Sequence, residues 1–299
     1  MPCRLRLALL IPAAAIFSFG CSVAPPPFDG QKAMADLVAQ CEFGPRPPGS
    51  PAHDSCRVWL VERLRSLADT VIEQRFEHFD SLRNVWLQMT NIIARFGRGE
   101  KRRILCAHWD TRPVAEHDPD TARRDEPILG ANDGASGVAV LLEMARLFSL
   151  KRPPVSTDII LFDGEDYGPE GRLDLYLLGS KYFSQNVNPE TYEFAILLDM
   201  VGDADLRVGP EVYSTRYAPE LVDRVWSVAE EMGVTEFDRF ARYSLYDDHI
   251  PLLQKGIPAV DIIDFEYPPW HTHADTPDKC SAESLAKVGR VVAAVMYSR

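Results

Sequence analysis

The sequence predicts an α/β fold, a three-layer sandwich in which helices cover both faces of a central, twisted, mostly parallel mixed sheet. Short apolar runs of strand length alternate along the chain with longer segments whose apolar residues recur at helical spacing. Strands that alternate with helices pair mainly in parallel, and the connecting helices cover the two faces of the sheet. Of the 299 residues, 46% are hydrophobic and 25% are charged, and composition is even along the chain. We therefore expect a single domain over residues 33–299.

The N-terminal residues 1–20 predict an export signal that lies outside this fold. Two arginines precede an apolar run over 7–19, which is too short to span a bilayer. The run stops at Gly20-Cys21, which resembles the cleavage site of a bacterial lipoprotein whose cysteine carries the lipid. Secretion with cleavage nearby is the alternative. The proline-rich residues 21–32 are expected to form a tether, so the protein is exported, either periplasmic or anchored to a bacterial membrane by lipid at Cys21.

The first part of the domain is expected to contain two helices followed by two strands. Residues 31–41 have helical character. Residues 54–68 carry an apolar stripe at helical spacing, which consists of Val58, Leu60, Val61, Leu64 and Leu67. Residues 71–79 and 87–96 alternate or run apolar, as strands do.

The rest of the domain alternates between strands and helices. Apolar runs indicate strands over 103–107, 158–162, 194–198 and 259–263. Helical patterns cover 137–150, 219–232 and 282–297. In sheets of this kind the functional residues collect at the carboxyl ends of the strands, so polar side chains at these ends are the candidates for a site.

Acidic and imidazole side chains stand where these strands end. His108 follows the first strand of the alternating series, the pair Glu165-Asp166 follows the second, and Asp199 follows the third. A single residue of this kind is usually structural, and a solvated turn is the alternative for the acid pair. In a water-poor site one carboxylate of the pair could bind a metal, while the other has its pKa raised toward the range of a general acid/base.

Two further candidates lie in loops. Asp133 stands among the glycines of GANDGASG, just ahead of a predicted helix, and an N-cap is its structural alternative. His271 follows Trp270 and two prolines, on a loop stiff enough to aim an imidazole, and His273 is a weaker competitor. Three carboxylate or imidazole ligands and an open position make a catalytic zinc site. The sequence therefore predicts a metalloenzyme.

Asp247 and Asp248 form a second acid pair. Like charges so close rarely both remain ionised without a partner, and a proton shared with Asp199 would resolve the conflict. Cys41 and Cys56 flank a proline-rich loop, for which both a disulfide and two buried free thiols stay open.

Other classes of function lack their signatures in this sequence. There is no HExxH helix, no CxxC pair, no G-x-S-x-G elbow and no Walker lysine motif. The net charge of −12 and the lack of a basic stripe argue against nucleic acid, because nothing would neutralise its phosphates. We expect no nucleic-acid partner, and contact with a membrane only through the N-terminal lipid.

Several motifs, in order from about residue 40 to the C-terminus, resemble the zinc aminopeptidase-like superfamily and, within it, the glutaminyl cyclases of animal type and their bacterial relatives. The motifs are AHWDT, GANDGASGVAVLLEMAR, FDGEDYG, LGSKYF, LLDMVG, DDHIPLL and WHTHADTPDKCS. The resemblance implies that the enzyme acts on peptide or protein N-termini and converts N-terminal glutamine to pyroglutamate with release of ammonia. A monomer is expected. A binding lipoprotein without activity is disfavoured, because no metal ligand is missing.

The resemblance also assigns roles. One zinc ion would be held by Asp133, Asp166 and His271, and Glu165 would be the general acid/base. Asp199 and Asp247 would belong to the proton-sharing network beside Glu165, and Trp270 would form an aromatic wall of the substrate pocket.

Three positions depart from the pattern of the family. Asp166 stands where the family commonly has glutamate, so this ligand reaches less far. A network histidine of the animal enzymes falls near Asp261, and an aromatic residue expected shortly after the acid pair is replaced near Gly171.

The two-zinc aminopeptidases of the same superfamily are the alternative. In them His108, Asp133 and Asp199 would bind one metal, and Asp133, Asp166 and His271 the other. All these positions are present, so a second zinc is possible besides the one expected. The aminopeptidase would hydrolyse N-terminal residues with metal-bound hydroxide. Trp270 and the DDHIPLL segment favour the cyclase.

Overall fold

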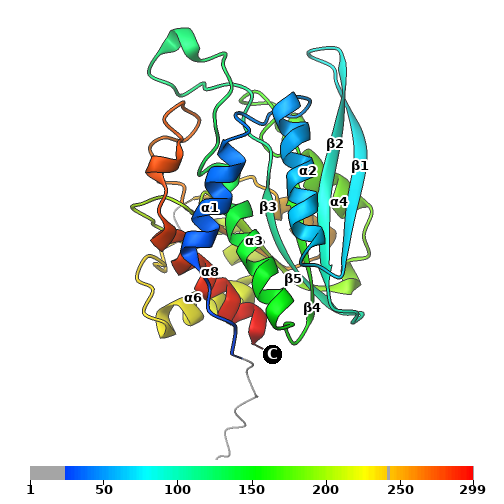
Figure 1. Ribbon diagram of the computed structural model, residues 1–299, viewed down its shortest axis with the longest axis vertical. Coiled ribbons are helices and arrows are strands. Elements are labelled where there is room, and N and C mark those ends of the chain that lie inside the picture. The colour runs from blue at the N-terminus through cyan, green and yellow to red at the C-terminus, as the bar shows by residue number, and fades with distance from the viewer. Residues whose placement is uncertain (1–23, 241–242, 299) are drawn as a thin grey trace, which may run out of the picture.

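The computed structural model describes residues 24–240 and 243–298, and it shows a sheet of six strands between two layers of helices (Figure 1). The strands are β1 (Thr70–Asp80), β2 (Val85–Phe96), β3 (Arg102–His108), β4 (Ser156–Phe162), β5 (Tyr192–Asp199) and β6 (Ala259–Ile263). Their order is β1-β2-β4-β3-β5-β6. The last four in this order are parallel, whereas β2 is antiparallel to both β1 and β4. The predicted mostly parallel mixed sheet is confirmed.

Helices cover both faces of this sheet. One face carries α1 (Gly30–Cys41), α2 (Pro51–Arg65), α3 (Ala135–Leu150), α6 (Pro219–Glu231) and α8 (Ala282–Tyr297). The other face carries α4 (Leu178–Gln185) and α7 (His249–Lys255), and the short α5 (Val212–Tyr217) lies beside β6. Single 3-10 turns are η1 (Thr121–Arg123), η2 (Leu173–Leu175), η3 (Pro189–Thr191) and η4 (Pro277–Lys279).

Alternation of side chains along the strands divides the core in two. In β3, Leu105 and Ala107 belong to the large core that includes α3, whereas Ile104 and Cys106 belong to the smaller core that includes α4 and α7. β3 is buried along its whole length, as expected for a central parallel strand. Its last residue, His108, therefore lies inside the protein.

Helix α3 packs closely on the sheet because Gly137 has no side chain. A Cβ atom at Gly137 would lie 2.3 Å from the backbone oxygen of Leu198 and 3.0 Å from Cβ of Ala107. Gly134, just before the helix, has a φ of 100°, which a residue with a side chain rarely adopts. The two glycines bring the start of α3, with Asp133 ahead of it, against the carboxyl ends of β3 and β5.

Helix α2 differs from its prediction at both ends, and it ends at Arg65 rather than at residue 68. It begins at Pro51 rather than at residue 54, because the side chain of Ser50 accepts a hydrogen bond from the N–H of His53 and proline is well suited to the first helical position. Within the apolar stripe, Val58 is 46% exposed, whereas Leu60, Val61 and Leu64 are buried.

The first helix begins before residue 33. Asp29 caps α1, and Phe28 packs against the large core, so the last three residues of the expected tether belong to a helix. The expected signal and Cys21 lie outside the described residues. No helix in the described ranges is both long and apolar enough to cross a membrane.

Cys41 and Cys56 are free thiols, so the disulfide that the sequence left open is not formed. Burial raises the pKa of each thiol to about 11, against the positive charge of Arg46. Both therefore behave as small apolar groups of the core.

Candidate metal centre

Three side chains that are far apart in the sequence converge at the carboxyl edge of the sheet. Asp133 lies ahead of α3, Asp166 in the loop after β4, and His271 in the loop after β6. One ligand atom of each lies within 4.8 Å of the others, and all three residues are buried. Oδ2 of Asp133 and Oδ2 of Asp166 have no hydrogen-bond partner among the described residues. Buried carboxylate oxygens without partners are costly, so this group suits a cation.

His271 is aimed at the two carboxylates by its neighbours. Its Nε2 lies 3.6 Å from Oδ2 of Asp133 and 3.6 Å from Oδ1 of Asp166, while its Nδ1 faces Oε1 of Glu116 at 3.3 Å. The backbone of His271 has a φ of 56°, in the left-handed region, and its carbonyl accepts a hydrogen bond from the N–H of His117. An imidazole whose second nitrogen faces a carboxylate is the common arrangement of a metal ligand.

The structural alternatives for this group do not hold. Nδ1 of His273 lies 2.8 Å from Oδ2 of Asp118, and His273 belongs to none of the candidate metal groups of the described residues. The N-cap of α3 is Gly134, with no side-chain hydrogen bond to the helix, so Asp133 does not cap it.

Arg112, which the sequence did not single out, fixes the carboxylate of Asp166. Nη1 of Arg112 donates to Oδ1 of Asp166 at 2.6 Å, and Nη2 donates to the hydroxyl of Tyr176 at 2.6 Å. The same guanidinium pairs with Glu116. Because Arg112 occupies Oδ1, the oxygen of Asp166 that is left for a cation is Oδ2.

Two buried aspartates hold the backbone that carries the ligands, and sequence reasoning missed both. Asp110 accepts hydrogen bonds from the N–H groups of Glu165 (3.2 Å) and Asp166 (3.3 Å). Asp275 accepts from the N–H groups of Asn132 (2.8 Å) and Asp133 (3.2 Å). Both lie inside the quoted motifs AHWDT and WHTHAD, and this was the only signal the sequence offered.

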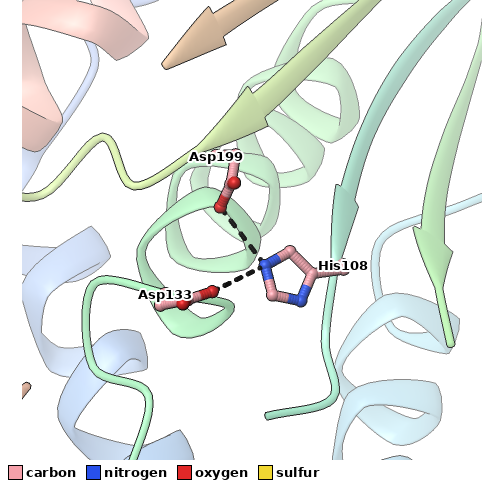
Figure 2. A group of neighbouring side chains, drawn as sticks. All are labelled: His108, Asp133 and Asp199. Carbon is pink, nitrogen blue, oxygen red and sulfur yellow. Dashed lines mark hydrogen bonds and ion pairs between the residues drawn. The ribbon is translucent and has the colours of Figure 1, made fainter. Parts of the chain in front are cut away.

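A second group shares Asp133 with the first (Figure 2). Nε2 of His108 lies 3.2 Å from Oδ1 of Asp133 and 3.2 Å from Oδ1 of Asp199, which ends β5. Burial opposes a charge on His108, but the neighbouring carboxylates raise its pKa well above the ordinary value. In this group the imidazole and the carboxylates satisfy one another directly.

Glu165 lines the cavity beside the first group. Burial raises its pKa well above the ordinary value, and the negative charge of Asp166 raises it further. A carboxyl group whose pKa is raised toward the working pH can both accept a proton and give one up, which a general acid/base requires.

The two acids of the second pair point in different directions. Oδ1 of Asp248 accepts from the hydroxyl of Ser180 at 2.5 Å, whereas Asp247 lines the cavity together with Asp199. Burial raises the pKa of Asp247 well above the ordinary value, and the charge of Asp199 adds to this. A proton shared between Asp199 and Asp247 would relieve their repulsion.

The candidate residues surround one cavity of about 180 Å³. The ring of Trp270 forms part of its wall, with its centroid 3.9 Å from that of His271 and 4.8 Å from that of Phe265. Tyr176 also lines the cavity, whereas a Cβ atom at Gly171 would touch nothing. The aromatic residue after the acid pair is thus supplied by Tyr176, from the end of a 3-10 turn that the sequence did not predict.

The structure brings all the predicted site residues together. Those that line the cavity are Asp133, Glu165, Asp166, Asp199, Asp247, Trp270 and His271, and His108 is buried against two of them. Arg112, Glu116, Asp110, Asp275 and Tyr176 complete the site.

The chain is similar to known peptidases and glutaminyl cyclases. Residues 91–296 match the model of peptidase family M28. The bovine glutaminyl-peptide cyclotransferase is 27% identical over 289 residues, which cover 83% of this chain and 76% of the relative. The crystal structure of Bacteroides thetaiotaomicron glutaminyl cyclase bound to N-acetylhistamine has a TM-score of 0.89 and 36% identity, and covers 92% of this chain and 100% of its own. A zinc-dependent exopeptidase of Parabacteroides distasonis has a TM-score of 0.87 and 37% identity, with coverage of 92% and 100%. The chain therefore belongs to peptidase family M28.

Proposed function

We propose that this protein is a zinc-dependent glutaminyl-peptide cyclotransferase, which converts N-terminal glutamine of peptides or proteins to pyroglutamate and releases ammonia. The observation that carries the proposal is a single cavity that combines an unsatisfied ligand group, a carboxyl of raised pKa at Glu165, and an indole wall at Trp270. The bovine relative and the B. thetaiotaomicron structure, both glutaminyl cyclases, support it.

The residues present fit one zinc ion. Asp133, Asp166 and His271 offer two carboxylate oxygens and one imidazole nitrogen, a donor set that zinc commonly takes in catalytic sites. Nε2 of His271 lies 3.6 Å from Oδ2 of Asp133, which has no hydrogen-bond partner among the described residues, and 3.6 Å from Oδ1 of Asp166, which Arg112 holds. When bound, zinc would polarise the γ-carboxamide carbonyl of the substrate glutamine.

Glu165 carries the proton through the reaction. Its carboxylate takes a proton from the α-amine as the nitrogen attacks the γ-carbon, and returns one to the departing ammonia. The N–H of Glu165 is held by Asp110, so the carboxyl group is fixed beside the ligands. Asp199 and Asp247 line the same cavity, and they can share the proton that Glu165 takes up.

The shape of the cavity suits cyclisation rather than hydrolysis. The rings of Trp270, Phe265 and Tyr176 border this cavity of about 180 Å³, which accommodates one side chain folded back on its own amine, so that a bound substrate would displace water from the γ-carbon. With water excluded, the amine is the nucleophile next to the γ-carbon.

A two-zinc aminopeptidase is the second candidate, because His108, Asp133 and Asp199 form another group with ligand spacing. The contacts favour a single ion. His108 pairs directly with the carboxylates of Asp133 and Asp199, whereas Oδ2 of Asp166 in the first group has no hydrogen-bond partner among the described residues.

The test is product analysis on peptides that begin with glutamine and with leucine. The purified domain should release ammonia and leave pyroglutamate on the first, and should leave the second intact. A chelator should abolish the reaction, and zinc should restore it at about one ion per chain. Free amino acids from both peptides, without ammonia, would assign the protein to the aminopeptidases.

We also propose that the protein is exported and carries a lipid on Cys21, on the sequence of residues 1–21. In a bacterial host the wild type should sediment with membranes and incorporate labelled fatty acid, and Cys21→Ser should do neither. A soluble wild type without label would leave secretion with cleavage nearby.

A further inference from the structure

Behind the cavity, a row of buried polar side chains leads away from Asp247. A ligand atom of Asp247, one of Asp261 on β6 and one of His249 on α7 lie within 4.8 Å of one another. Nδ1 of His249 lies 3.7 Å from Oδ2 of Asp261, and Nε2 of His249 lies 3.1 Å from Oε2 of Glu211. The exposed fraction of each of the four residues is 5% or less.

Several polar atoms of this row make no hydrogen bond to other described residues. Both carboxylate oxygens of Asp261, Oδ2 of Asp247 and Nδ1 of His249 have no hydrogen-bond partner in the described part of the chain. Fully buried groups that serve only packing are normally satisfied. These atoms face one another, so protons can pass between them with small movements of the side chains.

The row ends at a second, water-sized cavity. Glu211 borders a space of about 10 Å³, enough for about one water molecule, whose other walls include Arg207 and Glu266 near the surface. Leu245, Ile263 and Phe265 line both this space and the catalytic cavity. These three apolar side chains separate the two cavities, and the row of polar side chains connects the cavities around them.

The proposed reaction requires that a proton leave the substrate, and such a row of polar side chains can carry it. An N-terminal amine has a pKa of about 7.7–8.0, so near neutral pH most of the substrate arrives as the ammonium ion. This ion must lose one proton before its nitrogen can attack. Glu165 is occupied by the proton that it passes from amine to ammonia, and the bound substrate fills the mouth of the cavity beside Trp270. The extra proton needs another exit.

We propose that Asp247, Asp261, His249 and Glu211 form the path by which this proton reaches solvent. The inference rests on the proposed function. Asp247 accepts the proton from the substrate ammonium. Asp261 passes it to Nδ1 of His249 while Nε2 releases its own proton to Glu211, and water in the second cavity takes it up. The substrate is left as a neutral amine, the acids return to their starting state, and rotation of the His249 ring restores its first tautomer.

The surroundings of Asp261 favour movement of a proton over a fixed ion pair. The titratable groups that face it are Asp199 from β5, Asp247, Asp248 and His249 around the start of α7, and Glu211 at the start of α5. Glu211 also accepts the N–H groups of Tyr213 and Ser214, which hold it as a carboxylate and make it pass a proton onward.

The test is Asp261→Asn, measured as kcat/KM on a glutamine peptide at about pH 6 and about pH 9. The amide keeps the shape, and the oxygens that it replaces have no hydrogen bonds to lose. Without the path only the neutral amine reacts, which is about 1% of the substrate at the lower pH and most of it at the higher. The variant should lose about 10- to 100-fold of the wild-type value at pH 6 and less than about 2-fold at pH 9.

Zinc content and melting temperature are measured on the same samples, and both should match the wild type. Asp248→Asn is the matched control, because its oxygen still accepts from Ser180 and lies off the path. Any change of kcat/KM in Asp248→Asn should be the same at about pH 6 as at about pH 9. If Asp261→Asn folds poorly, His249→Gln repeats the test.

Equal loss at both pH values, or no loss, would overturn the path while leaving the cyclase intact. A wild type that releases no ammonia at either pH would overturn the proposed function, and the path with it.

Discussion

At the scale of single residues, the adjacent acids Glu165 and Asp166 have different surroundings and therefore different tasks. Asp166 is bound by Arg112 and faces His271, so positive groups surround it. Burial raises the pKa of Glu165, and the negative charges of Asp166 and Asp247 raise it further. The carboxyl group of Asp166 therefore suits a cation, and that of Glu165 suits proton transfer.

Glu165→Gln should leave zinc bound and reduce kcat about 10²- to 10⁴-fold, because the amide keeps the shape and cannot carry a proton. Asp166→Ala should lose both zinc and activity, since it removes a ligand. Zinc per chain and ammonia release are measured on both. Asp174→Asn, in an exposed acid paired with Arg172, is the control. Equal zinc loss in the two site variants would show that the roles are assigned wrongly.

Trp270→Ala should lower kcat/KM on glutamine peptides about 10- to 100-fold with zinc content unchanged, because an indole face that covers the substrate contributes about 1.5–3 kcal/mol of apolar contact. Kinetics, zinc content and melting temperature are measured together. Trp86→Ala, in a tryptophan that is 65% exposed on β2, is the matched control and should match the wild type. Loss of zinc along with activity would mean that Trp270 serves only to pack the His271 loop.

At the scale of elements, the strands and long helices were predictable because their pattern is local. The buried strand β3 contains a continuous apolar run over 104–107, and α8 repeats its apolar face over 16 residues. Helices α4 and α7 were not predicted, because 8 and 7 residues hold too few turns to show a period. They form because Phe183 and Leu252 pack on the sheet, which is a tertiary effect.

The site shows the same difference between features that follow from a local sequence pattern and features that depend on distant segments. Ligand candidates such as His108 and Asp199 could be predicted because each stands at the end of a strand. Arg112, Glu116 and Tyr176 could not, because they lie in loops whose course depends on contacts with distant segments. Arg112, for example, meets Asp166 across 54 positions of sequence.

Gly137→Ala tests how far the site depends on the packing of α3. In an open helix this change would stabilise by about 1 kcal/mol. Here the new Cβ would lie 2.3 Å from the oxygen of Leu198, so α3 must move away from the sheet and take Asp133 with it. We expect a loss of about 1–3 kcal/mol in urea unfolding, with weaker zinc binding. A gain in stability would mean that α3 does not set the position of Asp133.

At the scale of the whole molecule, the fold gathers acids from many elements into one buried region. The net charge of the chain is −12, and the site adds carboxyl groups that burial makes difficult to ionise. Burial raises the pKa of Glu165, Asp247 and Asp261 well above their ordinary values, and the charges of neighbouring acids raise it further. Stability should therefore depend on what neutralises them, either protons or a cation.

The metal-free protein should be more stable at about pH 5 than at about pH 8. A carboxyl whose pKa is higher in the folded than in the unfolded state contributes stability that is fully present below the unfolded value, near about 4, and is lost as pH rises through the folded value. With chelator we expect the melting temperature to fall by about 5 °C or more between these two pH values. Zinc should reduce this fall, because a cation stabilises the ionised carboxylates that alkaline pH produces. Thermal unfolding at both pH values, with chelator and with zinc, measures this, and Glu165→Gln should show a smaller fall than the wild type. A metal-free protein that melts higher at pH 8 would mean that these acids are ionised in the fold without a cation.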